Sequence, residues 1–229
     1  GVFCIENSTP GVSRGVTIRD CTVFGTWAGA YVTHESNDRC AIVGCKAYGC
    51  NRGMDIRVRR MQILGNELYG IADPAGIEDG IYLSGDARDL MIADNVIVGW
   101  RYGIRGYDSG WFTGSEPSNI VIRGNTIDTI NQIGIYLQQT KNNNGFTGVI
   151  VESNKISEFD ADAIRIEGEF EGAVVRGNSI IASSAPTGYG VRLMGTNKSR
   201  VVRNTFDGVT PVRLENDTQG SPASPRNPI

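Results

Sequence analysis

The sequence IVIRGNTID at residues 120–128 sets a pattern that recurs along most of the chain. It consists of a short run of alternating β-branched residues, a pivot at Asn125 and a second short apolar run. Segments of this kind follow one another at spacings of 21 to 30 residues, and six of the eight pivots are Asn. The other seven segments are GVTIRDCTV (15–23), CAIVGCKAY (40–48), MQILGNELY (61–69), LMIADNVIV (90–98), VIVESNKIS (149–157), AVVRGNSII (173–181) and SRVVRNTFD (199–207).

Each pivot predicts a sharp bend between two short strands. Asn is the non-glycine residue that best tolerates the left-handed backbone conformation, so we expect the pivots themselves to adopt it. A third strand-like stretch follows before the next repeat. These stretches are GAYVTH (29–34), GMDIRV (53–58), GIYLSG (80–85), GIRGYD (103–108), GIYLQQ (134–139), AIRIEG (163–168), GVRLMG (190–195) and PVRLEN (211–216).

Three short strands in every repeat predict an all-β parallel solenoid of about eight coils. A propeller or sandwich would need hairpin turns every 8–12 residues or so, which the sequence lacks. The pattern resembles the right-handed parallel β-helix of the pectate-lyase-like superfamily over residues 1–216. We expect one domain there, lacking its N-terminal cap, and an extended tail at residues 217–229. The superfamily contains pectin- and alginate-active enzymes and phage tailspikes, so the resemblance implies a polysaccharide ligand.

The composition excludes several classes of protein. The chain has 22 Lys and Arg against 25 Asp and Glu, a net charge of −3 and a pI near 5.3, and its one tight basic cluster lies at residues 57–60. We therefore expect no nucleic-acid partner. No apolar run reaches the length of a membrane span. The five Cys all lie in the first fifty residues and are interpreted as free, mostly buried thiols, and a single His excludes a site of several histidines.

Alternate residues of the third strand should face solvent, because side chains alternate across a strand. With Ile81 and Leu83 inside, the outward positions form a ribbon of Tyr, Arg and carboxylates. Neighbouring coils are about 4.8 Å apart, close to the length of one sugar unit. Tyr rings offer faces for pyranose stacking, and Arg offers a planar fork for acidic sugars. The expected substrate-binding residues are Tyr31, Arg57, Tyr107, Tyr136, Gln138 and Arg165 of the ribbon, with Trp111 from a long loop that would wall the groove.

The resemblance places catalytic chemistry on this face, near the middle of the solenoid. The candidates are Asp55, Asp79, Tyr82, Arg105 and Asp108. Lyase chemistry would use Arg57, Arg105 or a bound calcium ion to neutralise a uronate carboxylate. Tyr82, Tyr107 or a desolvated arginine would then be the base. Hydrolysis would use two of the carboxylates on either side of the bond. We expect no cofactor, or else Ca²⁺ held by Asp73, Glu78 and Asp86.

Two hypotheses remain open from the sequence. The first is a carbohydrate-active enzyme, a polysaccharide lyase or glycoside hydrolase, that works in a groove over the third strands. The second is a glycan-binding or structural solenoid without turnover, such as a segment of a phage tailspike or an adhesin. Either would act in an extracellular or virion-associated location. A homotrimer is also possible, because aromatic loops such as residues 106–118 would suit a subunit interface equally well.

Overall fold

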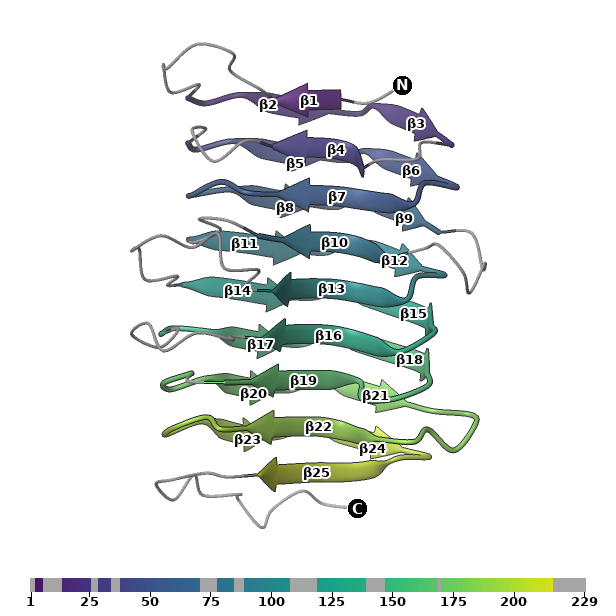
Figure 1. The fold of residues 1–229 in the computed structure, drawn as a ribbon, viewed down its shortest axis with the longest axis vertical. Coiled ribbons are helices and arrows are strands. Elements are labelled where there is room, and N and C mark those ends of the chain that lie inside the picture. Colours follow the sequence, from purple (N-terminus) through teal and green to yellow (C-terminus); the bar gives the residue numbers. More distant parts are fainter. Residues whose placement is uncertain are drawn as a thin grey trace.

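The computed structural model describes residues 3–5, 14–25, 29–33, 38–70, 78–84, 89–107, 119–138, 147–168 and 170–215. Over these ranges the chain forms strands and turns, and none of it is a helix that could cross a membrane. The strands stack as successive coils along one axis, with the N-terminal strands at one end and β25 at the other (Figure 1). The predicted parallel solenoid is therefore confirmed.

The described strands form three sheets, and the chain visits each sheet once per coil. Every pairing between neighbouring strands is parallel. Sheet 1 contains β1 (Phe3–Ile5), β4 (Gly29–Thr33), β7 (Arg52–Ile56), β10 (Asp79–Leu83), β13 (Tyr102–Tyr107), β16 (Ile133–Gln138), β19 (Ile164–Glu167), β22 (Tyr189–Met194) and β25 (Thr210–Glu215). Sheet 2 contains β2 (Thr17–Arg19), β5 (Ala41–Val43), β8 (Gln62–Leu64), β11 (Leu90–Ala93), β14 (Ile120–Arg123), β17 (Ile150–Glu152), β20 (Val174–Arg176) and β23 (Arg200–Val202). Sheet 3 contains β3 (Thr22–Phe24), β6 (Lys46–Tyr48), β9 (Glu67–Tyr69), β12 (Val96–Val98), β15 (Thr126–Ile130), β18 (Lys155–Phe159), β21 (Ser179–Ile181) and β24 (Thr205–Asp207).

The core is built from columns of identical side chains that repeat from coil to coil. In sheet 2, Ile42, Ile63, Ile92 and Ile122 pair in register and are fully buried. Such β-branched residues pack well on a pleated strand surface. This regular interior holds the sheets at fixed positions, so outward side chains of sheet 1 also fall into straight rows.

A second interior column consists of the pivot asparagines, and it corrects one prediction. Asn125 is buried, and its Nδ2 donates to the Ile92 carbonyl at 3.0 Å and to Asn154 Oδ1 at 2.9 Å. The left-handed backbone falls on the preceding residue, as at Gly124 (φ 64°) and Asp94 (φ 59°). The expectation that the Asn itself adopts this conformation is wrong. Each buried bend exposes backbone polar groups inside the protein, and the carboxamide satisfies them.

The four cysteines whose side chains the structure describes lie at the N-terminal end of the interior and are free thiols, as predicted. Cys40, Cys45 and Cys50 are buried, and Cys21 is partly buried. Burial raises the pKa of the Cys40 and Cys45 thiols, so they stay protonated at neutral pH. Cys45 takes a pivot position, and its backbone N–H continues the ladder by donating to Asn66 Oδ1 at 2.9 Å.

Tyr31 is a correction to the predicted outward ribbon. It is fully buried, pairs in register with the core residue Met54, and its hydroxyl donates to the Cys21 carbonyl at 3.0 Å. The prediction aligned Gly29 with Gly53, which shifts the strand by one residue and exchanges its two faces. Because Tyr31 has no exposed surface, its assignment as a substrate-binding residue is wrong.

Candidate functional site

The outer face of sheet 1 carries a row of polar side chains in strict register. Asp55 pairs with Tyr82, Tyr82 with Arg105, and Arg105 with Tyr136. The row continues through the last strands as Arg165, Arg192 and Arg213. The predicted ribbon therefore exists from β7 to β25, and its members follow one another at the spacing of neighbouring strands.

A second row, parallel to the first, lies three residues earlier in each strand and was missed by the sequence reasoning. Arg52 pairs with Asp79, and Asp79 with Tyr102. Regular alternation would place residues three positions apart on opposite faces of a strand. Side-chain contacts nonetheless bring Arg52 together with Asp55, since Arg52 Nη1 donates to Asp55 Oδ2 at 3.1 Å. Arg105 likewise lies 4.6 Å from the centroid of the Tyr102 ring. Strand alternation gave no signal for this second row, and the predicted strands also began one residue too late, at the glycines. The two rows together make up the candidate site.

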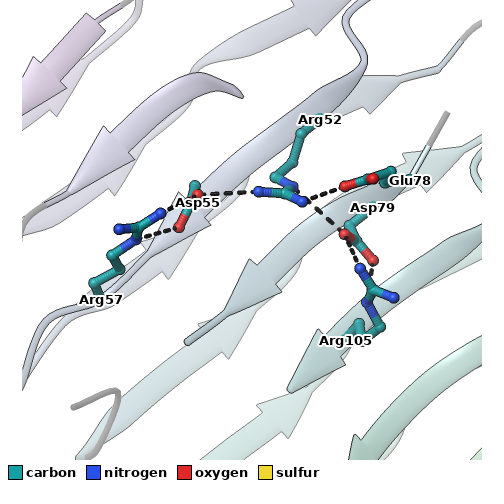
Figure 2. Close-up of polar contacts among 6 residues, drawn as sticks. All are labelled: Arg52, Asp55, Arg57, Glu78, Asp79 and Arg105. Carbon is teal, nitrogen blue, oxygen red and sulfur yellow. Dashed lines mark hydrogen bonds and ion pairs between the residues drawn. The ribbon is translucent and has the colours of Figure 1, made fainter. Parts of the chain in front are cut away.

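Asp79 is the buried centre of the site (Figure 2). Its side chain is 0% exposed. Arg105 donates from Nη2 to Asp79 Oδ2 at 2.8 Å, and its Nε lies 2.7 Å from Oδ1. On the other side, Arg52 Nε lies 3.4 Å from Oδ2. Both Nε contacts are ionic rather than hydrogen-bonded. Within the described residues, Arg52 Nε, Arg105 Nε and Asp79 Oδ1 make no aligned hydrogen bond.

Asp55 forms the second carboxylate of the same network (Figure 2). It accepts hydrogen bonds from Arg57 Nε at 3.0 Å and from Arg52 Nη1 at 3.1 Å, and its side chain is 7% exposed. Arg52 also donates to Glu78, which is 48% exposed. Three guanidinium groups and three carboxylates therefore form one coupled network across β7, β10 and β13.

Aromatic rings alternate with the guanidinium groups on this surface. The Tyr82 ring lies between Arg52, 4.3 Å from its centroid, and Arg105, 5.1 Å from it. Arg105 also lies 4.6 Å from the Tyr102 centroid, and Tyr102 stacks on Tyr136 at 5.9 Å. We call Arg52, Tyr82, Arg105, Tyr102 and Tyr136 the cation–π ladder. Such contacts favour a fixed geometry for both partners.

Burial changes the protonation of the ladder and its centre. It raises the pKa of the Asp79 carboxyl to about 6, against the lowering effect of Arg105 and Arg52. Burial also raises the pKa of the Tyr82 and Tyr136 phenols. Both phenols are therefore protonated at neutral pH. This favours Tyr82 as a hydrogen-bond or proton donor over the base suggested by the sequence.

The other described candidates lie beside the ladder. Tyr136 donates from its hydroxyl to Glu167 Oε2 at 3.1 Å, and Gln138 donates to Glu167 Oε1 at 3.4 Å. Arg165 lies 5.6 Å from the Tyr136 centroid. Arg57, half exposed, contacts Asp55. Asp73, Asp86, Asp108, Trp111 and the Tyr107 side chain lie outside the described residues, so their predicted roles stay predictions.

A second acidic centre lies towards the C-terminal end of the same face. Asp162 is 0% exposed, and Arg165 Nε donates to its Oδ2 at 2.5 Å, while Arg192 lies 3.9 Å away. Its Oδ1 accepts the backbone N–H of Tyr189 at 2.7 Å. We call this group, with Arg213 and Glu215, the C-terminal cluster.

The described residues give no direct support for a calcium site. Within the ranges that the structure describes, no three His, Cys, Asp or Glu residues are grouped so that they could hold a metal ion. Glu78, the one described member of the predicted ligand set, is paired with Arg52. Calcium binding by Asp73, Glu78 and Asp86 therefore stays a prediction.

Stacked parallel coils with an outward polar row define the class of protein as a β-helix. The chain belongs to the right-handed β-helix family, whose model, described as "Right handed beta helix region", matches residues 1–156. The model of a second family, described as "Periplasmic copper-binding protein (NosD)", matches residues 108–222. That segment contains neither Cys nor His, the donors that bind copper best, so its residues do not fit a copper site. No curated protein sequence matches the chain.

Three solved structures are similar in fold. The Dettilon tailspike protein superposes with a TM-score of 0.63 and 17% identity, covering 87% of this chain and 50% of the tailspike chain. An alginate lyase from Paenibacillus sp. gives 0.61 and 16%, covering 91% of this chain and 92% of the lyase. The Streptococcus pneumoniae surface protein and adhesin PfbA gives 0.58 and 12%, covering 90% and 77%. The chain thus spans about half of the tailspike, and the likeness concerns the fold alone.

Proposed function

We propose that this chain binds a polysaccharide along the outer face of sheet 1, across β7, β10, β13 and β16. The observation that carries the proposal is the cation–π ladder, which places a phenol or guanidinium on each of these strands. Strands about 4.8 Å apart repeat these groups at close to the length of one sugar unit. The stacked coils therefore repeat phenol and guanidinium groups at about the spacing at which a polysaccharide repeats its sugar units.

The chemistry of the surface favours an acidic or complex polysaccharide. Guanidinium groups recognise carboxylates and other oxygen acceptors through parallel hydrogen bonds. The similar fold of a tailspike, an alginate lyase and an adhesin supports a surface or glycan ligand, and supports an extracellular or virion-associated location. The proposed homotrimer depends on the loop at residues 106–118, most of which lies outside the described residues, and stays a prediction.

Cleavage by elimination is a second candidate function, and one observation favours it. Arg105 lies beside the protonated phenol of Tyr82, with Asp79 holding the guanidinium in place. Arg105 would neutralise a uronate carboxylate, which acidifies the C5 proton, and Tyr82 would protonate the leaving oxygen as the C4–O bond breaks. Tyr107 or Asp108 would be the base that removes the C5 proton. Hydrolysis is less well supported, because the carboxylates of Asp55 and Asp79 are buried beneath arginines.

The test is incubation with polyuronates and bacterial capsular polysaccharides, with and without Ca²⁺. Binding is measured by affinity electrophoresis, elimination by the ultraviolet absorbance of the new unsaturated sugar, and hydrolysis by reducing ends without that absorbance. We expect binding to at least one acidic polymer. Absence of binding across the whole panel would overturn the proposal.

A further inference from the structure

The two faces of the Tyr82 ring are both occupied by protein. Tyr82 lies on β10, which is placed between β7 and β13 in sheet 1. Arg52 approaches from β7 at 4.3 Å and Arg105 from β13 at 5.1 Å. The ring therefore has a guanidinium on each side. A sugar ring cannot stack on it without displacing a charged group that is itself held by Asp79.

The next rings along the ladder are covered in the same way. Tyr136 lies on β16, between β13 and β19. Tyr102 stacks on it from β13 at 5.9 Å, and Arg165 approaches from β19 at 5.6 Å. Aromatic residues on glycan-binding surfaces usually stack on pyranose faces. The rings at these positions cannot do so, because neighbouring side chains cover their faces. The hydroxyls and guanidinium edges remain as the groups that can reach a ligand.

The two arginines of the ladder differ in how many of their N–H groups already have a carboxylate partner. Arg52 is engaged by Asp55, Glu78 and Asp79 together. Arg105, by contrast, directs Nε and Nη2 at the single carboxylate of Asp79, and among the described residues no partner contacts its Nη1. Its side chain is 21% exposed. The Nε edge of the guanidinium is therefore held by Asp79, and the edge that carries Nη1, here called its outer edge, has no hydrogen-bond partner among the described residues.

The tyrosine hydroxyls show the same division. The Tyr136 hydroxyl already donates to Glu167 at 3.1 Å. For the partly exposed Tyr82, no described residue accepts a hydrogen bond from the hydroxyl, and the raised pKa keeps its proton in place at neutral pH. Tyr82 is adjacent to Arg105 in register, one strand away. Among the described residues neither the hydroxyl nor the outer guanidinium edge has a hydrogen-bond partner, and the two side chains are neighbours, with the Arg105 guanidinium 5.1 Å from the Tyr82 ring centroid.

We propose that this pair is the specificity-determining element of the surface: the Tyr82 hydroxyl and the outer edge of Arg105 bind one oxygen-rich group of a sugar through in-plane hydrogen bonds, without aromatic stacking. The inference rests on the proposed function and names how that surface selects its ligand. Asp79 acts as a positioning residue, because it holds Nε and Nη2 of Arg105 and leaves Nη1 out of that contact. The group bound is an oxygen acceptor such as a uronate carboxylate.

The experiment distinguishes binding by the Tyr82 hydroxyl from stacking on the face of the Tyr82 ring. The probes are oligogalacturonate and alginate oligomers, with dextran as a neutral glycan, and affinities are measured by isothermal titration calorimetry. Tyr82→Phe keeps the ring between the two arginines and removes only the hydroxyl. We expect it to lower the affinity for the acidic oligomers about tenfold, as expected for the loss of one hydrogen bond to a charged group. Tyr82→Leu should cause a loss of similar size.

Two further variants serve as matched tests. Arg105→Lys keeps the positive charge and removes the planar fork, so the affinity should fall at least as much as in Tyr82→Phe. Tyr48→Phe removes a phenol hydroxyl from sheet 3, where Tyr48 stacks on Tyr69 at 5.2 Å, and should leave the affinity unchanged. Circular dichroism and thermal unfolding of each variant show that the fold is intact.

The outcomes distinguish the inference from the proposed function. If the wild type binds and Tyr82→Phe binds equally well while Tyr82→Leu does not, ring stacking is used and the inference is overturned. If the wild type binds and neither Tyr82→Phe nor Arg105→Lys has an effect, the ligand lies elsewhere, and the inference falls while polysaccharide binding stands. If the wild type binds none of the acidic polymers, the proposed function itself is overturned, and the inference with it.

Discussion

Asp79 and Asp162 occupy equivalent places in the solenoid but contact different partners. Each lies two residues before an inward Ile, and the register carries Ile81 through Ile104 and Ile135 to Ile164. Both carboxylates are fully buried and lie beside arginines. Asp162, however, also accepts a backbone N–H, whereas all the contacts described for Asp79 are to guanidinium groups.

The difference in partners shows that the same position of the repeat can be tied to the backbone in one coil and to side chains in another. The backbone bond ties Asp162 to the coil that follows, where a Cβ on Gly188 would lie 2.3 Å from Asp162 Oδ1. The carboxylate therefore fits a space left by a glycine and stabilises the chain path. Among the described residues no backbone N–H donates to the Asp79 carboxylate, which contacts the guanidinium groups of Arg52 and Arg105. We propose that the C-terminal cluster is structural and that the central cluster contributes to ligand binding.

The largest expected effect follows from removing Asp162. Asp162→Ala leaves the Tyr189 N–H without its acceptor and Arg165 and Arg192 without their counter-ion. Breaking a buried ion pair in this way costs about 3–5 kcal/mol of unfolding free energy. Urea denaturation measures the loss. Asp162→Asn keeps an acceptor for the N–H and should lose clearly less, and equal losses would argue against the structural role of the backbone bond.

The pH dependence of stability should be specific to the central cluster. The pKa of Asp79 is about 6 in the folded protein and near 3.8 when unfolded, so the folded state binds the proton more tightly between these values. Stability therefore falls as the pH rises through 6, by about 3 kcal/mol in total. Denaturation of wild type and Asp79→Asn between pH 4 and pH 7 checks this. The variant should gain stability relative to the wild type as the pH rises, and a constant difference would contradict the prediction.

Substitution of Asp79 should lower the affinity for glycans, whereas substitution of Asp162 should leave it unchanged. Asp79→Asn removes one charged acceptor from Arg105 and loosens its orientation, so we expect the affinity for acidic oligomers to fall about fivefold, corresponding to about 1 kcal/mol. Asp162→Asn is the matched control, three coils away on the same face, and should bind as the wild type does. A loss of equal size in both variants would show that the two clusters act together.

The smallest effect is expected at an exposed ion pair, which gives the baseline for the comparison. Lys198 Nζ lies 2.8 Å from Glu171 Oε1, and both side chains are at least half exposed. Exposed pairs contribute little because water and salt screen them. Lys198→Ala should leave the unfolding midpoint and the glycan affinity unchanged within error. A measurable drop in either would mean that surface pairs contribute to the larger effects above.

Much of the architecture could be predicted because the solenoid repeats its constraints. The Ile columns and the pivots Asn66 to Asn204 recur at fixed places, so eight weak signals agree on one fold. The outward row from Asp55 to Arg213 followed from strand alternation alone. The same reasoning failed at Tyr31, because a glycine was used to set the register of a strand that is shifted by one residue.

The sequence by itself determined the parallel coils, the inward Ile and Leu columns and the residues of the outward row, because periodicity two within strands and one repeat per coil are local properties. Only the tertiary structure decided that Arg52 and Arg105 cover both faces of Tyr82, that the Asn pivots form a hydrogen-bonded ladder, and that Asp79 and Asp162 differ in their partners. These features depend on side chains meeting between neighbouring coils. Which groups meet there, and which remain free, is set by packing distances of a few ångströms that no sequence spacing records.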